Sequence, residues 1–245
     1  MKYIASCSFG KDSLATIILA HLHGEPLDEV IYVEVMFDKD ISGEIPEHRD
    51  FIYDVAIPKL ESWGYPVTVL RSDRTYIDCF YHKLVKGKRK GMTQGFPMQG
   101  KCLINRECKL RPIRQYMKGQ PKDLVQYIGI AVDESKRLER LDGNKISLLA
   151  KYGYTEAEAA KLCVEYGLLS PIYEFTSRGG CWFCPNARDK ELRHIRKCHP
   201  GLWERLLKLE EEQDLAGGKW NTLKNISLHD KENKFYWEDQ QISLF

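Results

Sequence analysis

The sequence predicts an α/β fold, a doubly wound parallel sheet, followed by a small helical and cysteine-rich C-terminal part. Three observations predict it. Short apolar runs of strand length alternate with segments of helical spacing, and this alternation is typical of parallel sheets wrapped by helices. The 245 residues are long enough for one such domain with a small appendage. A Cys-x-x-Cys sequence lies in the last third of the chain, beyond the alternating part.

The first strand and the first helix enclose a turn that is suited to bind an anion. Residues 3–7 are an apolar run of strand length, and residues 14–22 carry apolar side chains at helical spacing, so residues 8–13 fall on a tight strand-to-helix turn. Such a turn aims several backbone N–H groups, and the positive end of a helix dipole, at one point. We therefore expect this turn to bind a phosphate chain.

The side chains of the turn have distinct chemical uses. Gly10 lets the backbone approach a ligand closely, and Lys11 supplies a mobile positive charge. Ser8 and Ser13 offer hydroxyls, and Asp12 can hold Mg²⁺ or orient the lysine.

The elements that follow continue the alternation. Residues 30–37 are a second apolar run, residues 49–63 an amphipathic helix, residues 67–70 a third strand and residues 126–131 a buried type of strand. Ligands of a doubly wound sheet lie beyond the carboxyl ends of its strands, which makes Asp38 a candidate for contacting adenine or ribose. The alternative is an acidic residue that simply leads out of a strand.

The rest of the chain is expected to be mainly helical. Residues 76–90 look like a basic helix, and residues 145–168 hold two short helices, the second with a capping box at Thr155 and Glu158. We expect three consecutive parts: a nucleotide-binding α/β domain over 1–144, a helical Cys-x-x-Cys region over 145–212 and a tail over 213–245.

The turn resembles a known phosphate-binding loop. It lacks the glycine and the Ser or Thr of a Walker A loop, because Ala5 and Asp12 occupy those positions, and no GxGxxG follows the strand. Ser8-Phe9-Gly10-Lys11-Asp12-Ser13 resembles instead the PP-loop, SGGKDS, of the adenine nucleotide alpha-hydrolase superfamily, with Phe9 in place of the first glycine. The resemblance implies an enzyme that binds ATP and Mg²⁺ and releases pyrophosphate as it adenylates an acceptor, with Lys11 and Asp12 as catalytic residues.

Two further stretches resemble the PAPS reductase-like family of that superfamily. In residues 100–117 cysteines precede a basic helix, and in residues 126–137 a strand leads into an acidic-Ser-basic segment. By this resemblance the following residues contact the nucleotide and its α-phosphate: Gly129, Asp133, Glu134 and Arg137. Without it, the second stretch is an ordinary strand end followed by a charged helix start.

The chain contains eight cysteines, which in a reducing compartment indicate metal or redox ligands before disulfides. Cys181 and Cys184 supply half of a four-thiolate site. Cys102 and Cys108 are the best candidates for the other half, and this pattern resembles that of family members that hold a [4Fe-4S] cluster; zinc is the alternative. Rival ligands are Cys198 and His199, whereas packing roles are expected for Cys7 and Cys79.

The formal net charge of +2 is unevenly distributed. Residues 82–122 hold twelve Lys or Arg against one acid, Glu107. Such a basic block is typical of a solvated surface or of a phosphate-binding surface, so DNA or tRNA is a candidate partner. The chain end resembles the QLxLF peptide by which bacterial DNA enzymes dock on the sliding clamp, through Gln241, Ile242, Leu244 and Phe245; the alternative is a last segment folded onto its own core.

These observations favour one reaction class and leave two alternatives. The leading hypothesis is an adenylating enzyme that supports sulfur transfer, such as a phosphorothioation of DNA or a thiolation of tRNA. A sulfonucleotide (PAPS or APS) reductase is the first alternative, although the chain lacks the C-terminal cysteine segment of those enzymes. The second is a nucleotide-binding accessory protein at the sliding clamp. Without an apolar run of membrane-spanning length, or a signal sequence, the protein is expected to be cytoplasmic and not to bind a membrane.

Overall fold

The computed structural model describes residues 1–98, 100, 102–221 and 223–242. The chain folds into two compact units, each built from several separate segments. The first unit contains residues 1–34, 44–71 and 111–179, and the second contains residues 35–43, 72–110 and 180–245. Residues 145–179 therefore belong to the unit that also holds the predicted phosphate turn, and the units do not follow the three consecutive parts expected from the sequence.

The first unit is built on a parallel sheet of five strands in the order β3-β2-β1-β4-β5. The strands are β1 (Tyr3–Cys7), β2 (Glu29–Glu34), β3 (Val67–Arg71), β4 (Val125–Ile128) and β5 (Lys145–Ile146). The order reverses between β1 and β4, so the carboxyl end of β1 is the switch point of a doubly wound sheet, where ligands of such folds bind. The predicted fold class is confirmed.

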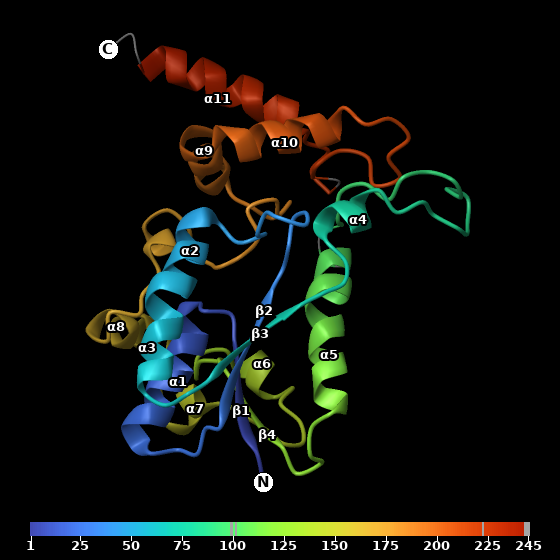
Figure 1. Ribbon diagram of the computed structural model, residues 1–245. Helices are drawn as coiled ribbons and strands as arrows, with labels where there is room; N and C mark the ends of the chain where they lie inside the picture. Colours follow the sequence, from blue (N-terminus) through green and yellow to red (C-terminus); the bar gives the residue numbers. More distant parts are fainter. Residues whose placement is uncertain (99, 101, 222, 243–245) are drawn as a thin grey trace. The chain divides into compact units, whose positions relative to one another are not determined.

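Helices lie on both faces of this sheet (Figure 1). On one face, α1 (Lys11–His23) packs against α7 (Leu148–Lys151) and α8 (Glu156–Glu165). The same face carries a helix of three consecutive segments, α2 (Pro46–Asp50), the π-helical η1 (Phe51–Ala56) and α3 (Ile57–Ser62). The opposite face is covered by α5 (Arg111–Lys118), and the short elements α6 (Ser135–Leu138) and η3 (Pro171–Glu174) complete the unit.

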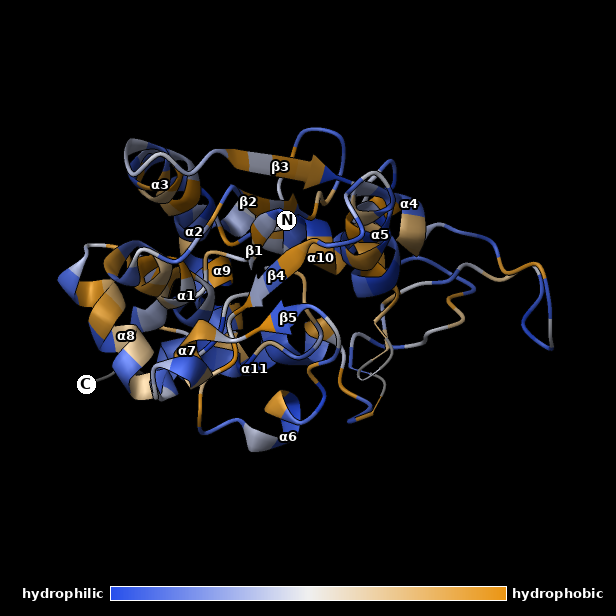
Figure 2. Ribbon diagram, turned by 90° about the horizontal axis from the view of Figure 1, so that it is seen from below, coloured by the Kyte–Doolittle hydropathy of each residue, from blue (hydrophilic) through white to orange (hydrophobic). Residues whose placement is uncertain are grey.

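The burial of α1 and of the inner strand β2 explains why these two elements lie at the centre of the unit. Eight of the thirteen residues of α1 are buried, and β2 is buried over its last five residues. Strands covered on both faces are expected to be continuous apolar runs, as Val30–Val33 is. Figure 2 shows hydrophobic colouring along β3 and β4.

The second unit has an aromatic core, and its described residues form five helical elements. They are α4 (Tyr76–Phe80), the π-helical η2 (Asn105–Leu110), α9 (Asp189–Cys198), α10 (Pro200–Glu210) and α11 (Leu228–Ile242). Its largest fully buried side chains are Phe37, Tyr76, Phe80, Phe96, Trp182, Phe183, Trp220 and Phe235. Among the described residues of both units, no helix is long and apolar enough to span a membrane.

Two expectations about these elements are wrong. The basic helix predicted over residues 76–90 ends at Phe80, and the chain continues as an exposed loop that returns through an antiparallel bridge between Lys83 and Thr93. Gly87 and Gly91 have positive φ angles there, and closely spaced like charges disfavour a helix. The apolar run 30–37 is a strand only to Glu34, because Val35 and the residues after it leave the sheet for the second unit.

Candidate functional site

The turn after β1 has the predicted strand-to-helix geometry. β1 ends at Cys7, Gly10 is the N-cap of α1, and the helix begins at Lys11. Lys11, Asp12 and Ser13 therefore form its first turn, where backbone N–H groups have no partner within the helix. The positive end of the α1 dipole coincides with the switch point of the sheet.

Ser8 and Ser13 shape this turn from within. The Ser13 hydroxyl donates to the Gly10 carbonyl at 2.9 Å and accepts the Ser8 N–H at 3.3 Å. The two serine oxygens are 3.5 Å apart. Ser13 is 8% exposed, so its hydroxyl braces the turn and is not free at the surface.

Phe9 stands where the PP-loop has its first glycine. Its φ angle of 55° lies in the left-handed region, which costs a residue with a Cβ about 1 kcal/mol or more. The side chain is fully buried and packs edge-on against Tyr32, with ring centroids 5.0 Å apart. Aromatic packing in the core thus offsets the backbone strain.

Tyr173 in η3 contacts the turn, although no pattern in the sequence indicated this contact. The Lys11 N–H donates to the Tyr173 hydroxyl at 2.9 Å, and a Cβ at Gly10 would come within 3.2 Å of the same oxygen. Burial raises the pKa of Tyr173, so this oxygen stays a neutral hydroxyl. A tyrosine oxygen thus binds one of the N–H groups expected to bind phosphate.

Lys11 is held between two carboxylates. Its Nζ lies 2.8 Å from an oxygen of Asp12 and 2.8 Å from an oxygen of Glu156, the first residue of α8. Burial opposes the charge on Lys11, but the hydrogen bonds to these acids raise its pKa. Burial also raises the pKa of Asp12, and the charges of Glu156 and Glu134 add to this rise. The sequence did not single out Glu156.

The structure brings the residues predicted after β4 to the same place. A Cβ at Gly129 would lie 2.7 Å from the carbonyl carbon of Asp12 and 2.7 Å from the Ser13 nitrogen, so only glycine fits against the first turn of α1. Asp133 accepts the backbone N–H of Glu156 at 3.2 Å. Glu134 accepts the Ala131 N–H at 3.2 Å and pairs with Arg137.

His48 is a second residue that the sequence did not indicate. It is 1% exposed; its Nδ1 lies 2.8 Å from the Ser170 hydroxyl and its Nε2 3.4 Å from the Ser8 carbonyl. This buried imidazole therefore holds the start of the turn against the segment that leads to η3.

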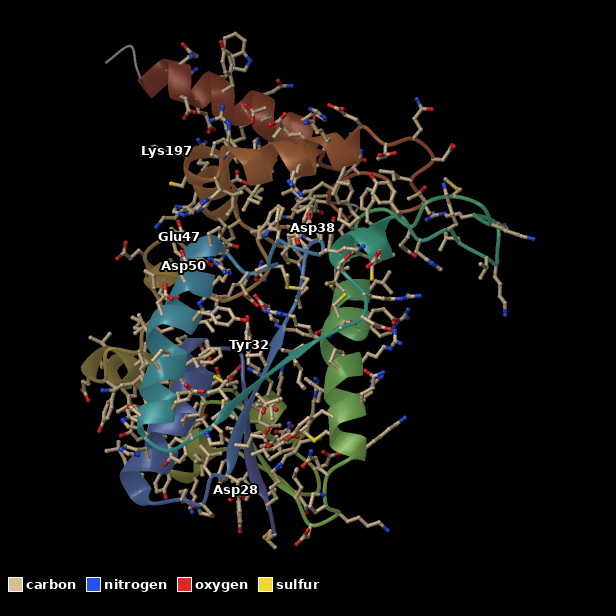
Figure 3. All side chains as sticks on the ribbon, viewed as in Figure 1. Asp28, Tyr32, Asp38, Glu47, Asp50 and Lys197 are labelled. Carbon is tan, nitrogen blue, oxygen red and sulfur yellow. The ribbon has the colours of Figure 1, made fainter. Side chains whose placement is uncertain are left out.

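Asp38, labelled in Figure 3, belongs to the second unit. It accepts the N–H groups of Asp40 and Ile41 and pairs with Arg205 at 2.7 Å. Burial alone would raise the pKa of Asp38, but these hydrogen bonds and the guanidinium lower it. Its predicted contact with the adenine or ribose stays a prediction.

The four predicted thiol ligands all belong to the second unit, and three of them lie near Tyr76. Burial raises the pKa of the Tyr76 hydroxyl, and so do nearby sulfurs, those of Cys102, Cys181, Cys184 and Cys79. Cys79, expected only to pack, lies with its sulfur 3.9 Å from that of Cys108. This contact lowers the pKa of Cys79 and raises that of Cys108, because one thiol donates to the other sulfur.

The donor set fits a group that is bound by thiolates. The buried Tyr76 hydroxyl has no hydrogen-bond partner among the described residues, and it is surrounded by soft sulfur ligands. A single zinc ion would hold four sulfurs about 3.8 Å apart, since each Zn–S bond is about 2.3 Å. Within the described ranges, no three cysteine sulfurs lie mutually within 4.8 Å. Both a zinc ion and an iron–sulfur cluster are bound by such ligands.

The predicted clamp-binding peptide is described only in part. Gln241 is exposed at the end of α11, which finishes at Ile242. The Ile242 side chain, Leu244 and Phe245 lie outside the described residues.

The fold is that of a doubly wound α/β protein with a strand-to-helix turn at the switch point of its sheet. No protein-family model matches the chain. An uncharacterized protein of Methanocaldococcus jannaschii is 23% identical over 235 residues, which are 88% of this chain and 50% of that protein. The chain thus spans about half the length of this relative. Among solved structures, the U34-tRNA thiolase NcsA of Methanococcus maripaludis, with its [4Fe-4S] cluster, is 19% identical with a TM-score of 0.41, over 89% of this chain and 75% of that chain.

Proposed function

We propose that this protein is a PP-loop enzyme that adenylates an acceptor with ATP, releases pyrophosphate and supports sulfur transfer, with nucleic acid as the acceptor. One observation carries the proposal. At the switch point of the sheet, the amino end of α1 holds Lys11 between Asp12 and Glu156. A cation, carboxylate oxygens and backbone N–H groups at one point are the components that bind Mg²⁺-polyphosphate.

The chemistry expected there is adenylyl transfer. An acceptor oxygen attacks the α-phosphorus of ATP, the bond from that phosphorus to the bridging oxygen breaks, and pyrophosphate leaves. Negative charge grows on the leaving pyrophosphate, where the Lys11 ammonium and the amides of the first turn of α1 stabilise it. A sulfur nucleophile then displaces AMP from the activated acceptor.

Asp12 and Glu156 have two roles in this scheme. Before nucleotide binds, they neutralise the Lys11 ammonium. When the polyphosphate pairs with the Lys11 ammonium, the carboxylate oxygens of Asp12 and Glu156 are released. They can then bind Mg²⁺, which prefers carboxylate ligands.

The thiol cluster is proposed to hold a [4Fe-4S] cluster through four of five candidates: Cys79, Cys102, Cys108, Cys181 and Cys184. When bound, such a cluster supplies a redox-active iron centre for sulfur chemistry. The soft sulfur donors near the buried Tyr76 hydroxyl support it, and zinc is the alternative.

The test is pyrophosphate release from ATP by the anaerobically purified protein, with and without tRNA or DNA oligonucleotides. We expect release that is stimulated by the acceptor and lost in Lys11→Ala. A matched control is Lys151→Ala, which removes a lysine that pairs with Glu25 on the same unit. If the wild-type protein neither binds ATP nor releases pyrophosphate, or if Lys11→Ala leaves ATP affinity unchanged, the proposal fails.

A role at the sliding clamp is a separate proposal, supported by the chain end and by the exposed position of Gln241. Its test is binding of the full chain to a purified clamp, compared with a chain lacking residues 241–245. Equal binding by the two chains would eliminate it, with no consequence for adenylation.

A further inference from the structure

The second unit contains a cavity of about 470 Å³ beside the Cys-x-x-Cys sequence. One wall begins directly after Cys184 and runs from Pro185 into α9, and the other is the segment before α11. The lining residues used below are Asn186, Arg188, Leu192, Trp220, Lys224 and Ile226. A cavity of this size accommodates one nucleotide or a comparably small ligand.

The two walls are joined to each other. The Asn221 side-chain amide donates to the Pro185 carbonyl at 3.1 Å. Asn221 and Ile226 exchange two backbone hydrogen bonds, of 3.0 and 3.2 Å, which close the loop between them. The cavity is therefore formed before any ligand arrives, next to the proposed sulfur centre.

The cavity combines an apolar floor with positive charge. Leu192 and Trp220 are buried, and Ile226 is half-buried. Lys231 pairs with Asp189 at 2.6 Å. Within the part of the chain that the structure describes, the side-chain nitrogens of Arg188 and Lys224 make no ion pair or hydrogen bond, so two cations remain for an anionic ligand.

A basic loop extends from the same unit. Between Tyr81 and Thr93 the chain carries no Asp or Glu, and the side chains of Lys86, Lys88 and Lys90 are exposed. Figure 1 shows this loop projecting after α4. Its base is fixed to the wall of the cavity, because Thr93 hydrogen-bonds with Asp214 and Ala216 and Phe96 packs edge-on against Trp220 at 5.4 Å.

The charge of the unit as a whole agrees with these two features. It contains 21 Lys or Arg against 16 Asp or Glu, whereas the first unit contains 16 against 19. Polyanions are therefore attracted to the unit that carries the cavity and the loop.

We propose that this cavity binds one unstacked nucleotide of the nucleic-acid acceptor. Its phosphate contacts Arg188 and Lys224, its base packs on the apolar floor, and the amide of Asn186 reads the edge of the base. The lysines of the loop bind the phosphates of the flanking strand. A duplex is too wide for the cavity, so the ligand is a single strand or a loop. That this nucleotide belongs to the acceptor rests on the proposed function, but its binding can be measured whether or not adenylation occurs.

The test is binding of fluorescent single-stranded RNA and DNA oligonucleotides to the full-length protein over a range of salt concentrations. For the double variant Arg188→Ala/Lys224→Ala we expect affinity to fall by about tenfold or more, and the salt dependence to fall by about two ions. The control is Lys197→Ala/Lys208→Ala, which removes two exposed cations of α9 and α10 away from the cavity; Lys197 is labelled in Figure 3. The control should bind like the wild type.

Two further variants show whether binding depends on the cavity or on surface charge alone. Arg188→Lys/Lys224→Arg keeps both charges and should restore most of the affinity. Ala187→Trp fills the cavity without changing charge and should weaken binding of the single strand as well. Circular dichroism and melting temperature show whether each variant is folded.

The outcomes distinguish this inference from the proposed function. Equal affinity of the wild type and Arg188→Ala/Lys224→Ala overturns the cavity assignment, and so does a wild type that binds no oligonucleotide. Binding of an acidic peptide with the same affinity and the same loss would also overturn it, because the site would then select charge alone. Pyrophosphate release from ATP decides the proposed function independently in every case.

Discussion

The backbone N–H of Lys11 donates a hydrogen bond to the side-chain hydroxyl of Tyr173 at 2.9 Å. This N–H belongs to the first turn of α1, where a helix offers N–H groups to a ligand. If the turn binds ATP as proposed, the polyphosphate competes with the tyrosine oxygen for this N–H.

Tyr173→Phe should consequently strengthen ATP binding. The loss of one hydroxyl partner leaves the Lys11 N–H unpaired in the free protein, which costs about 1 kcal/mol, whereas the nucleotide complex loses nothing. We expect ATP to bind roughly fivefold tighter and the free energy of unfolding to fall by about 1 kcal/mol. Isothermal titration calorimetry and urea unfolding measure the two quantities.

The control for this prediction is Tyr81→Phe, which removes a hydroxyl bonded to Glu212 in the second unit. It should leave ATP affinity unchanged. Weaker ATP binding by Tyr173→Phe would show that the hydroxyl contacts the nucleotide instead of competing with it.

Asp12→Asn should separate stability from nucleotide binding. Since burial raises the pKa of Asp12, the folded protein binds this proton more tightly than the unfolded chain does. Ionised Asp12 therefore destabilises the fold above its folded pKa; the penalty shrinks as the pH falls through that pKa and is gone below the lower pKa of the unfolded chain. Asp12→Asn should be more stable than the wild type at pH 7, and the difference should shrink on acidification.

The same variant should lose Mg²⁺-dependent ATP affinity, because an amide is a poorer Mg²⁺ ligand than a carboxylate. Thermal unfolding between about pH 7 and pH 4 and ATP titrations with and without Mg²⁺ test both parts. An exposed acid, Asp54, provides the control Asp54→Asn. A stability gain that grows at low pH would contradict the assignment.

Phe9→Gly and Phe9→Ala test whether the packing of the Phe9 ring offsets the strain of the left-handed backbone at this residue. Loss of the buried ring costs about 3–5 kcal/mol in either variant. Glycine, however, adopts the left-handed conformation at residue 9 without the Cβ penalty of about 1 kcal/mol. We expect Phe9→Gly to be the more stable of the two by about 1 kcal/mol in urea unfolding, although glycine is usually the less stable replacement. The opposite order would show that backbone strain at Phe9 is not significant.

The positions of the cysteines in the second unit predict which of them are needed for iron binding. Serine at Cys108, Cys181 or Cys184 should abolish iron binding, because a hard hydroxyl cannot replace the soft sulfur ligands near Tyr76 and beside Cys181. Comparison of Cys79→Ser with Cys102→Ser identifies the fourth ligand, since Cys79 contacts Cys108 and Cys102 is exposed. Iron content and visible absorption of anaerobically purified variants are the measurements.

Cys163→Ser is the control for this series, because Cys163 is buried in the first unit against the Lys11 carbonyl. It should retain iron. Stoichiometric zinc without iron in the wild type would rule out the cluster.

The sequence predicted the turn well because its determinants are local. An apolar run, a glycine and a helical pattern are adjacent in the chain, so the positions of Gly10 and Lys11 at the start of the helix follow from spacing alone. Tyr173 and Glu156 come to the turn from more than a hundred residues away, and no local pattern marks them.

The same distinction explains Cys79 and the basic segment. Cys79 has no cysteine at metal-ligand spacing, and only the fold of the second unit brings it to Cys108. The basic residues within 81–90 recur at a spacing that is compatible with a helix, but the segment lacks an apolar face that could be buried. The shape of the loop therefore depends on the contacts of Thr93 with Asp214 and Ala216.

Gly129→Ala tests how the carboxyl end of β4 supports the phosphate turn. The added methyl would lie 2.7 Å from the Asp12 carbonyl carbon and the Ser13 nitrogen, far inside van der Waals contact, and both atoms are rigid backbone. The first turn of α1 must therefore move, and the N–H groups and the Lys11 side chain move with it. We expect a loss of at least about 2 kcal/mol in the free energy of unfolding and of tenfold or more in ATP affinity.

Gly201→Ala is the matched control for this prediction. Gly201 lies in α10, and a Cβ there meets nothing within 4 Å. Alanine is favoured over glycine within helices by about 1 kcal/mol, so this variant should be as stable as the wild type or more stable, with unchanged ATP affinity. If Gly129→Ala behaved like Gly201→Ala, the strand end would not hold the turn. The position of the phosphate-binding N–H groups would then depend on β1 and α1 alone.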